Sequence, residues 1–191
     1  PSRSASLGSS VAGGSGAVRL SATAHPPVPR DLSAMWYAPA QGTAASPALA
    51  GFVRGVKLLE DDNNPTAALP LVSAPALQST PLADYARYYT GLALQRLERF
   101  DAAETAFAEV AARAIEGHLP EDAALRQAEV REARQKPADA LALYESLVTG
   151  TLSRPHVVWL RLGLAADAAG NRARAVEGLR RVYYEYPLST E

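Results

Sequence analysis

A repeat of about 36 residues is the feature of this sequence that most restricts its fold. Small residues recur at Gly55, Gly91, Ala128 and Gly163, at spacings of 36, 37 and 35 residues. Self-similarity at such a period indicates an array of one supersecondary unit, in which each unit buries its apolar face against its neighbours. Aromatic residues make up only 7% of the chain, too few for a large aromatic-rich sheet core.

The register extends beyond the small residues, because a second small residue follows each of them by 12 positions and a bulky residue comes four positions later. The clear copies are Gly91, Ala103 and Phe107; Ala128, Ala140 and Tyr144; and Gly163, Ala175 and Leu179, the last introduced by Trp159 and closed by Pro187. In a helical hairpin such small residues let two backbones approach, and the bulky residue fills the space between hairpins. The pattern resembles the tetratricopeptide repeat. This resemblance implies an all-α, right-handed superhelix, an α-solenoid of about four hairpins, with a degenerate first copy at Gly55.

Proline placement supports helices in the same register. Ten of the fourteen prolines precede residue 82, and the other four are Pro120, Pro137, Pro155 and Pro187. Proline is tolerated in the first turn of a helix and disrupts its interior, so these residues separate helices. We expect helices at 47–60, 65–73, 81–97, 101–116, 121–135, 138–148, 155–169 and 172–186.

Several helix starts carry a capping signal. Asn64-Pro65 and Thr80-Pro81 each place a capping side chain before a proline, and Asn171 follows Gly170 as an N-cap. Asp101 and Glu104 have the spacing of a capping box. These signals predict four helix N-termini.

Residues 1–46 differ from the rest of the chain. They contain four charged residues and two linker-like passages, Gly13–Gly16 and Pro26–Pro29. Such a segment buries too little apolar surface to offset its ordering entropy. The sequence therefore predicts a disordered tail at 1–46 and a repeat domain at 47–191.

Charge and residue content exclude several function classes. A net charge of −1 gives no polycationic footprint for nucleic acid, and the chain has no cysteine for disulfides, thiolate zinc sites or nucleophilic catalysis. No run of eighteen apolar residues is present, so no membrane span is expected. His25, His118 and His156 lack metal-ligand spacing, and no phosphate-binding glycine loop or serine elbow occurs. We expect no metal, no cofactor and no catalytic residue.

The remaining candidate is a surface. If the register holds, the first helix of each hairpin lines a concave groove in which tyrosines can anchor a peptide or a glycan. The alternative is that several of these residues pack against a neighbouring domain or helix pair. The candidate groove residues are Phe52, Tyr85, Tyr88, Leu92, Arg96, Leu125, Glu129, Leu160 and Leu164.

Two passages carry a narrower resemblance. Residues 80–93, with Phe107 after them, resemble the helical region that precedes the catalytic domain in soluble lytic murein transglycosylases, and residues 180–190 are similar to the Tyr-Pro, Ser phrase of that family. The resemblance implies a bacterial periplasmic scaffold for an enzyme that cleaves peptidoglycan glycan strands without hydrolysis. Outer-membrane assembly lipoproteins and other periplasmic repeat proteins share the Tyr-Pro-x-Ser ending.

The family's catalytic signature is not matched here. It consists of a Glu-Ser phrase followed by a Gly-Leu-Met-Gln-like phrase; Glu145-Ser146 is the one Glu-Ser pair, it lies at the end of a repeat helix, and no such phrase follows. We therefore expect a non-catalytic scaffold whose partner is a catalytic domain beyond Glu191 or a peptidoglycan or protein ligand. A free-standing periplasmic adaptor that binds a protein is the alternative. The apolar end of the last helix, with Val182 and Tyr183, favours a chain that continues into a further helix.

Overall fold

The computed structural model describes residues 46–114 and 117–189, so the predicted tail and the boundary that ends it lie almost entirely outside the described residues. These two ranges contain α-helices and one short 3-10 helix, and no strand. The elements are α1 Pro47–Glu60, α2 Pro65–Val72, the 3-10 helix η2 Pro75–Leu77, α3 Ala83–Arg96, α4 Phe100–Ala111, α5 Leu119–Ala133, α6 Pro137–Leu147, α7 Pro155–Ala168 and α8 Arg172–Glu185.

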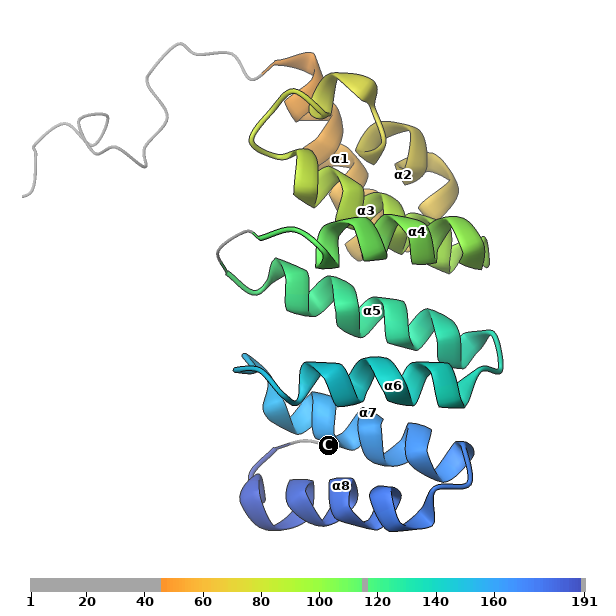
Figure 1. Cartoon of the computed structure of the whole chain (residues 1–191). Coiled ribbons are helices and arrows are strands. Elements are labelled where there is room, and N and C mark those ends of the chain that lie inside the picture. The colour runs from red at the N-terminus through yellow and green to blue at the C-terminus, as the bar shows by residue number, and fades with distance from the viewer. Residues whose placement is uncertain (1–45, 115–116, 190–191) are drawn as a thin grey trace, which may run out of the picture. The chain divides into compact units, whose positions relative to one another are not determined.

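The helices form a stack in chain order. Each α-helix packs against the next one along the chain, from α1 to α8, and the layers follow one another in Figure 1. The units of the stack are the antiparallel pairs α1–α2, α3–α4, α5–α6 and α7–α8. The described part of the chain is thus an all-α solenoid of helical hairpins, which confirms the predicted fold class.

The small residues of the repeat lie where paired helices come closest. A Cβ atom added at Gly91 would lie 2.7 Å from the ring of Phe107, and one at Gly55 would lie 2.8 Å from Val72. Gly163 is equally close to Leu179, and Gly178 of α8 approaches the Gly163 backbone from the other side. Real Cβ atoms essentially never lie under 3.0 Å from other atoms, so a side chain at Gly55, Gly91 or Gly163 would force its neighbours to shift.

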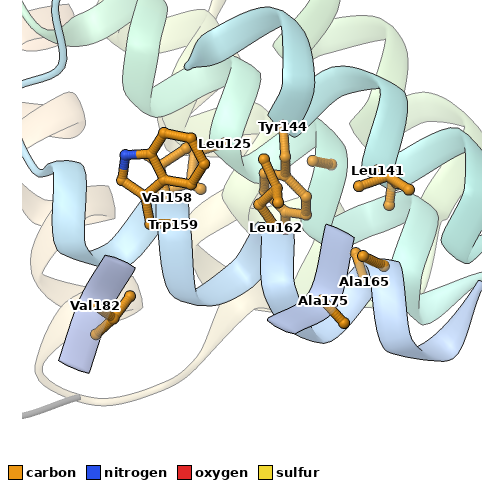
Figure 2. Packing of buried hydrophobic residues seen from close by; sticks show 12 residues of the cluster. Leu125, Leu141, Tyr144, Val158, Trp159, Leu162, Ala165, Ala175 and Val182 are labelled. Carbon is orange, nitrogen blue, oxygen red and sulfur yellow. The ribbon is translucent and has the colours of Figure 1, made fainter. Parts of the chain in front are cut away.

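Figure 2 shows the largest buried cluster, which joins α5, α6, α7 and α8. Tyr144 and Leu162 are fully buried at its centre, Trp159 lies beside them, and Ala140 and Ala175 fill the narrow space between helices. Two further clusters follow toward the other end of the stack: the one around Phe107 joins α3, α4 and α5, and the one around Leu59 joins α1, α2, η2 and α3. The core is therefore a series of small clusters between neighbouring hairpins.

Of three predicted N-cap residues, two cap their helices in the structure and one does not. Asn64 and Asn171 cap their helices as expected, accepting from the backbone N–H of Ala67 and Arg174. Thr80 does not cap α3, because the helix begins at Ala83 and the Thr80 hydroxyl accepts from the Leu82 N–H within the preceding turn.

The predicted capping box at Asp101 is also wrong. Helix α4 begins at Phe100, so Asp101 already lies inside its first turn. Asp101 and Glu104 instead form ion pairs across to α5, at 2.7 Å with Arg134 and at 2.8 Å with Arg131 respectively. These two acidic residues, one helical turn apart, therefore form ion pairs with the next helix and do not cap the N-terminus of α4.

The boundary between α4 and α5 differs from the prediction as well. Helix α4 ends at Ala111 instead of residue 116, and α5 begins at Leu119, two residues earlier than expected. Gly117 has a φ of 104°, and Leu119 is buried in the cluster around Phe107. After the early end of α4, Leu119 opens α5 and packs into the core.

We predict that Gly91→Ala lowers the free energy of unfolding by about 1–3 kcal/mol, because the added methyl group overlaps the buried ring of Phe107. Gly51→Ala in α1 is the matched control. Its Cβ would lie 3.8 Å from the nearest atom, so it should raise stability by about 0.5–1 kcal/mol through helix propensity alone. Urea denaturation of both variants measures the difference, and two variants of equal stability would contradict the packing role of Gly91.

Candidate binding face

The odd-numbered helices share one face of the stack, which we call the odd-helix face and define as the side formed by α1, α3, α5 and α7. Contacts between alternate helices define it. Arg96 of α3 donates a hydrogen bond to the Leu59 carbonyl at the end of α1, and its guanidinium lies 3.3 Å from the Glu60 carboxylate. The rings of Phe52 and Tyr89 meet edge to face at a centroid distance of 5.8 Å. These contacts tie α1 directly to α3.

Charged residues make the same connection further along. Arg161 of α7 lies 3.5 Å from both Glu129 and Glu132 of α5, and Glu129 also accepts from Arg126 at 2.8 Å. Arg126 in turn interacts with the hydroxyl of Tyr88 on α3, whose pKa is raised by burial and only partly lowered by that arginine. A continuous chain of ionic and hydrogen-bonding contacts thus runs from α3 to α7.

These contacts follow the repeat register. Tyr89, Arg126 and Arg161 each stand two positions before the small residue of their repeat, and each reaches back toward the preceding odd helix. The position is therefore structurally equivalent in three hairpins although its chemistry changes from aromatic to cationic. This register position is the signal by which the sequence could have identified Arg161, which the groove prediction omitted.

Glu132 on α5 is a partly buried carboxylate that faces Arg161. Burial raises the pKa of Glu132 above its ordinary value, although the Arg161 charge opposes the shift. The buried Tyr144 hydroxyl lies near the same carboxylates, and both burial and their charge raise its pKa.

The predicted groove residues differ in how far their side chains are exposed to solvent. Tyr85 is 43% exposed and Leu164 is 47% exposed, whereas Tyr88, Glu129 and Leu160 are partly buried. Arg96 is engaged in the contacts with α1 described above. The exposed pair therefore provides the apolar contact area of the odd-helix face.

Three members of the predicted groove need correction. Phe52, Leu92 and Leu125 are 7%, 6% and 5% exposed and belong to the three core clusters. The register correctly placed these residues on odd helices, but their side chains point inward and are buried between hairpins. They stabilise the face from below and do not lie open to a ligand.

A shallow pocket of about 290 Å³ lies at the α5–α7 end of this face. Its lining joins the exposed Leu164 and the Arg161 guanidinium to Glu132, with Ala165, Ala168, Gln135 and Pro137 completing it. The pocket is open, and its lining combines apolar side chains with one cation and one acid. Such a surface suits contact with a polypeptide side chain better than enclosure of a small molecule.

The predicted packing residues lie at the hairpin contacts. Gly55, Gly91, Ala103, Phe107, Ala128, Ala140, Tyr144, Trp159, Gly163 and Ala175 are all buried. Leu179 contacts Gly163 but is 37% exposed, and Pro187 is exposed after α8. Trp159 has a role that its spacing did not reveal, because the guanidinium groups of Arg174 and Arg181 stack on its ring at 5.4 and 4.4 Å.

The two described ranges contain neither a metal centre nor a helix suited to crossing a membrane. They contain no group of three side chains that could hold a metal ion. His118, which lacks metal-ligand spacing in the sequence, lies 3.6 Å from Asp122. No helix in the described part of the chain has the length and apolar character needed to cross a membrane.

Comparison with known families agrees with the geometry. A family model for the tetratricopeptide repeat matches residues 158–189, which span most of α7 and all of α8. No match was found among curated proteins. The matched hairpin is thus similar to a tetratricopeptide repeat, and the other hairpins of the described solenoid repeat its spacing.

We predict opposite pH dependences for two glutamates. The raised pKa of Glu132 means that its charge costs more in the folded than in the unfolded state, so Glu132→Gln should gain stability relative to the unaltered chain as pH rises above about 4.5. The pKa of Glu104 is lowered by Arg131 and Arg134 against the effect of burial. Glu104→Gln should therefore lose about 1 kcal/mol at pH 7, a loss that disappears as pH falls below about 4.5.

Urea titrations of both variants at pH 4 and pH 7 provide the measurement. If the two substitutions change stability with the same sign as pH rises, the assignment of a burial cost to Glu132 is wrong.

Proposed function

We propose that this chain is a non-catalytic scaffold whose odd-helix face holds a protein partner. The observation that carries the proposal is the arrangement of that face: Tyr85 and Leu164 are exposed on a surface whose helices are linked by Arg96, Arg126 and Arg161. Exposed apolar side chains on a preorganised surface favour binding, because little conformational entropy is lost when the partner docks. Tetratricopeptide-like repeats serve in this way as interaction surfaces.

The partner we propose is the catalytic domain of a peptidoglycan lytic transglycosylase, located in the bacterial periplasm and joined to this chain after Glu191. The support is the resemblance of residues 80–93 and 180–190 to the helical region of that enzyme family. A face that binds the downstream domain in cis would orient it on the glycan strand. Glu145-Ser146 lies at the end of helix α6, and Glu145 forms an ion pair with Arg174 at 3.3 Å. This packing role favours a catalytic glutamate elsewhere in the protein.

We predict that the full-length protein releases anhydro-muropeptides from purified peptidoglycan and that the chain ending at Glu191 does not. Mass spectrometry of the soluble products distinguishes the 1,6-anhydro ends from hydrolytic ones. Release by the chain ending at Glu191 would show that the scaffold itself is catalytic. Absence of such products with the full-length protein would exclude a transglycosylase and favour a free-standing adaptor.

We also predict that the double variant Tyr85→Ala, Leu164→Ala weakens binding of the isolated downstream domain to the scaffold at least about tenfold. Both side chains are exposed, so the fold should tolerate their loss. Arg99→Ala, in the exposed turn between α3 and α4, is the control and should bind normally. Isothermal titration calorimetry measures the affinities. Equal affinity of the double variant and the control would place the interaction on another surface.

A further inference from the structure

The junction between α1 and α3 is closed by an arginine of the chain itself. Arg96, the last residue of α3, donates a hydrogen bond to the Leu59 carbonyl at the end of α1. Its guanidinium also lies 3.3 Å from the Glu60 carboxylate, and its side chain is only 32% exposed. One arginine side chain thus lies between the C-terminal ends of two successive odd helices and is largely covered there.

The junction between α5 and α7 carries an alanine at the same register position. Ala168 follows Gly163 by five positions, as Arg96 follows Gly91, so the two residues are equivalent in the repeat. The shallow pocket of about 290 Å³ described above lies at this junction, and Ala168 is part of its lining. Because alanine is the shorter residue, the pocket remains open where the arginine side chain lies between α1 and α3.

The pocket also offers an acid to a cation. Glu132 lines it from α5 and follows Ala128 by four positions, as Leu59 follows Gly55. The residue whose carbonyl accepts from an arginine at the first junction is therefore replaced here by one that also carries a carboxylate. Burial raises the pKa of Glu132 although Arg161 lies 3.5 Å from it, so a second cation would stabilise its charged form.

The other walls of the pocket suit the rest of an arginine side chain. Leu164, Ala165 and Ala168 line it from α7 and can cover an alkyl stem. The C-terminal turn of α5, where Glu132 lies, carries the partial negative charge of a helix end. A guanidinium presents five donors in one plane and can serve a carboxylate and a carbonyl together, as Arg96 does, whereas an ammonium is a compact point charge.

The junction between α3 and α5 does not have this combination. Its equivalents of Ala168 and Glu132 are Ala133 and Gln95. A small residue is present there as well, but a neutral amide replaces the carboxylate. Among the three junctions between odd helices in the described residues, the one between α5 and α7 therefore joins an open place to an acidic side chain.

From these observations we propose that the pocket at the α5–α7 junction binds an arginine side chain of the protein partner, as Arg96 is bound between α1 and α3. The inference rests on the proposed function, because the partner supplies the arginine. In the complex the guanidinium lies between the Glu132 carboxylate and the carbonyl groups at the end of α5, and its stem packs on Leu164. Arg161 stays with Glu129, whose carboxylate lies 3.5 Å from it.

The pocket can be tested on this chain without the partner. The probe is N-acetyl-arginine methylamide, and the citrulline and lysine analogues are matched controls, because citrulline keeps the shape of arginine without its charge. In an NMR titration the arginine probe should shift the amides of Glu132, Leu164 and Ala168 in a saturable way, and both analogues should bind at least about fivefold more weakly. Equal binding of either analogue, or no saturable shift with arginine, would overturn the assignment.

Two substitutions locate the probe. Glu132→Gln removes the charge and keeps the shape, whereas Ala168→Arg supplies a guanidinium from within the chain, as Arg96 does at the first junction. Each should weaken binding of the arginine probe at least about fivefold. Glu145→Gln on α6 is the control, since that carboxylate is also partly exposed and paired with an arginine, and it should leave binding unchanged. If all three variants bind the probe equally, the probe lies elsewhere and the inference is wrong.

Binding of the partner separates this inference from the proposed function. Ala168→Arg should weaken binding of the isolated downstream domain at least about tenfold by isothermal titration calorimetry, because the pocket is then filled from within the chain. If that domain binds Ala168→Arg as tightly as the unaltered chain, the arginine assignment is wrong and the scaffold proposal stands. If the arginine probe occupies the pocket but the domain binds no part of the odd-helix face, the proposed function fails and the pocket assignment stands.

Discussion

The close approach of the two helices within each hairpin is the constraint on which the rest of this structure depends. The space that a side chain at Gly91 would need is filled by the Phe107 ring. The space beside Gly163 is filled by Leu179 and by the backbone of Gly178. Because the helices lie this near, the bulky side chain is pressed outward into the gap between hairpins, where the next hairpin covers it. Phe107 and Tyr144 are fully buried for this reason. One small residue thus determines both the pairing within a hairpin and the stacking between hairpins.

A second set of contacts links alternate helices and gives the odd-helix face its character. Arg96, Arg126 and Arg161 connect α1 to α3, α3 to α5 and α5 to α7. Each of these pairs is partly exposed, so each contributes little to stability on its own. Their effect is to fix the spacing of the helices that carry Tyr85 and Leu164. A surface held in this way presents its exposed side chains in a defined arrangement, which is what a docking surface for a folded partner requires.

The candidate face shows how far reasoning from the repeat reaches. The register placed every predicted groove residue on an odd helix, and it placed Tyr85 and Leu164 where they are open to solvent. It could not separate them from Leu92 or Leu125, which lie on the same helices and are buried. Spacing along one helix defines a direction around its axis, whereas burial depends on how far the neighbouring hairpins tilt over that direction. Arg161 was omitted for a different reason: its partners Glu129 and Glu132 lie on the preceding odd helix, and only the equivalence of Tyr89, Arg126 and Arg161 in the repeat register points to it.

The sequence by itself determined the number and order of the helices, their pairing into hairpins and the contacts between small and bulky residues, because all of these follow from short spacings along the chain. Only the tertiary structure decided the turn that ends α4 at Ala111 and the ionic contacts between alternate helices. These features depend on distances between segments that are remote in sequence.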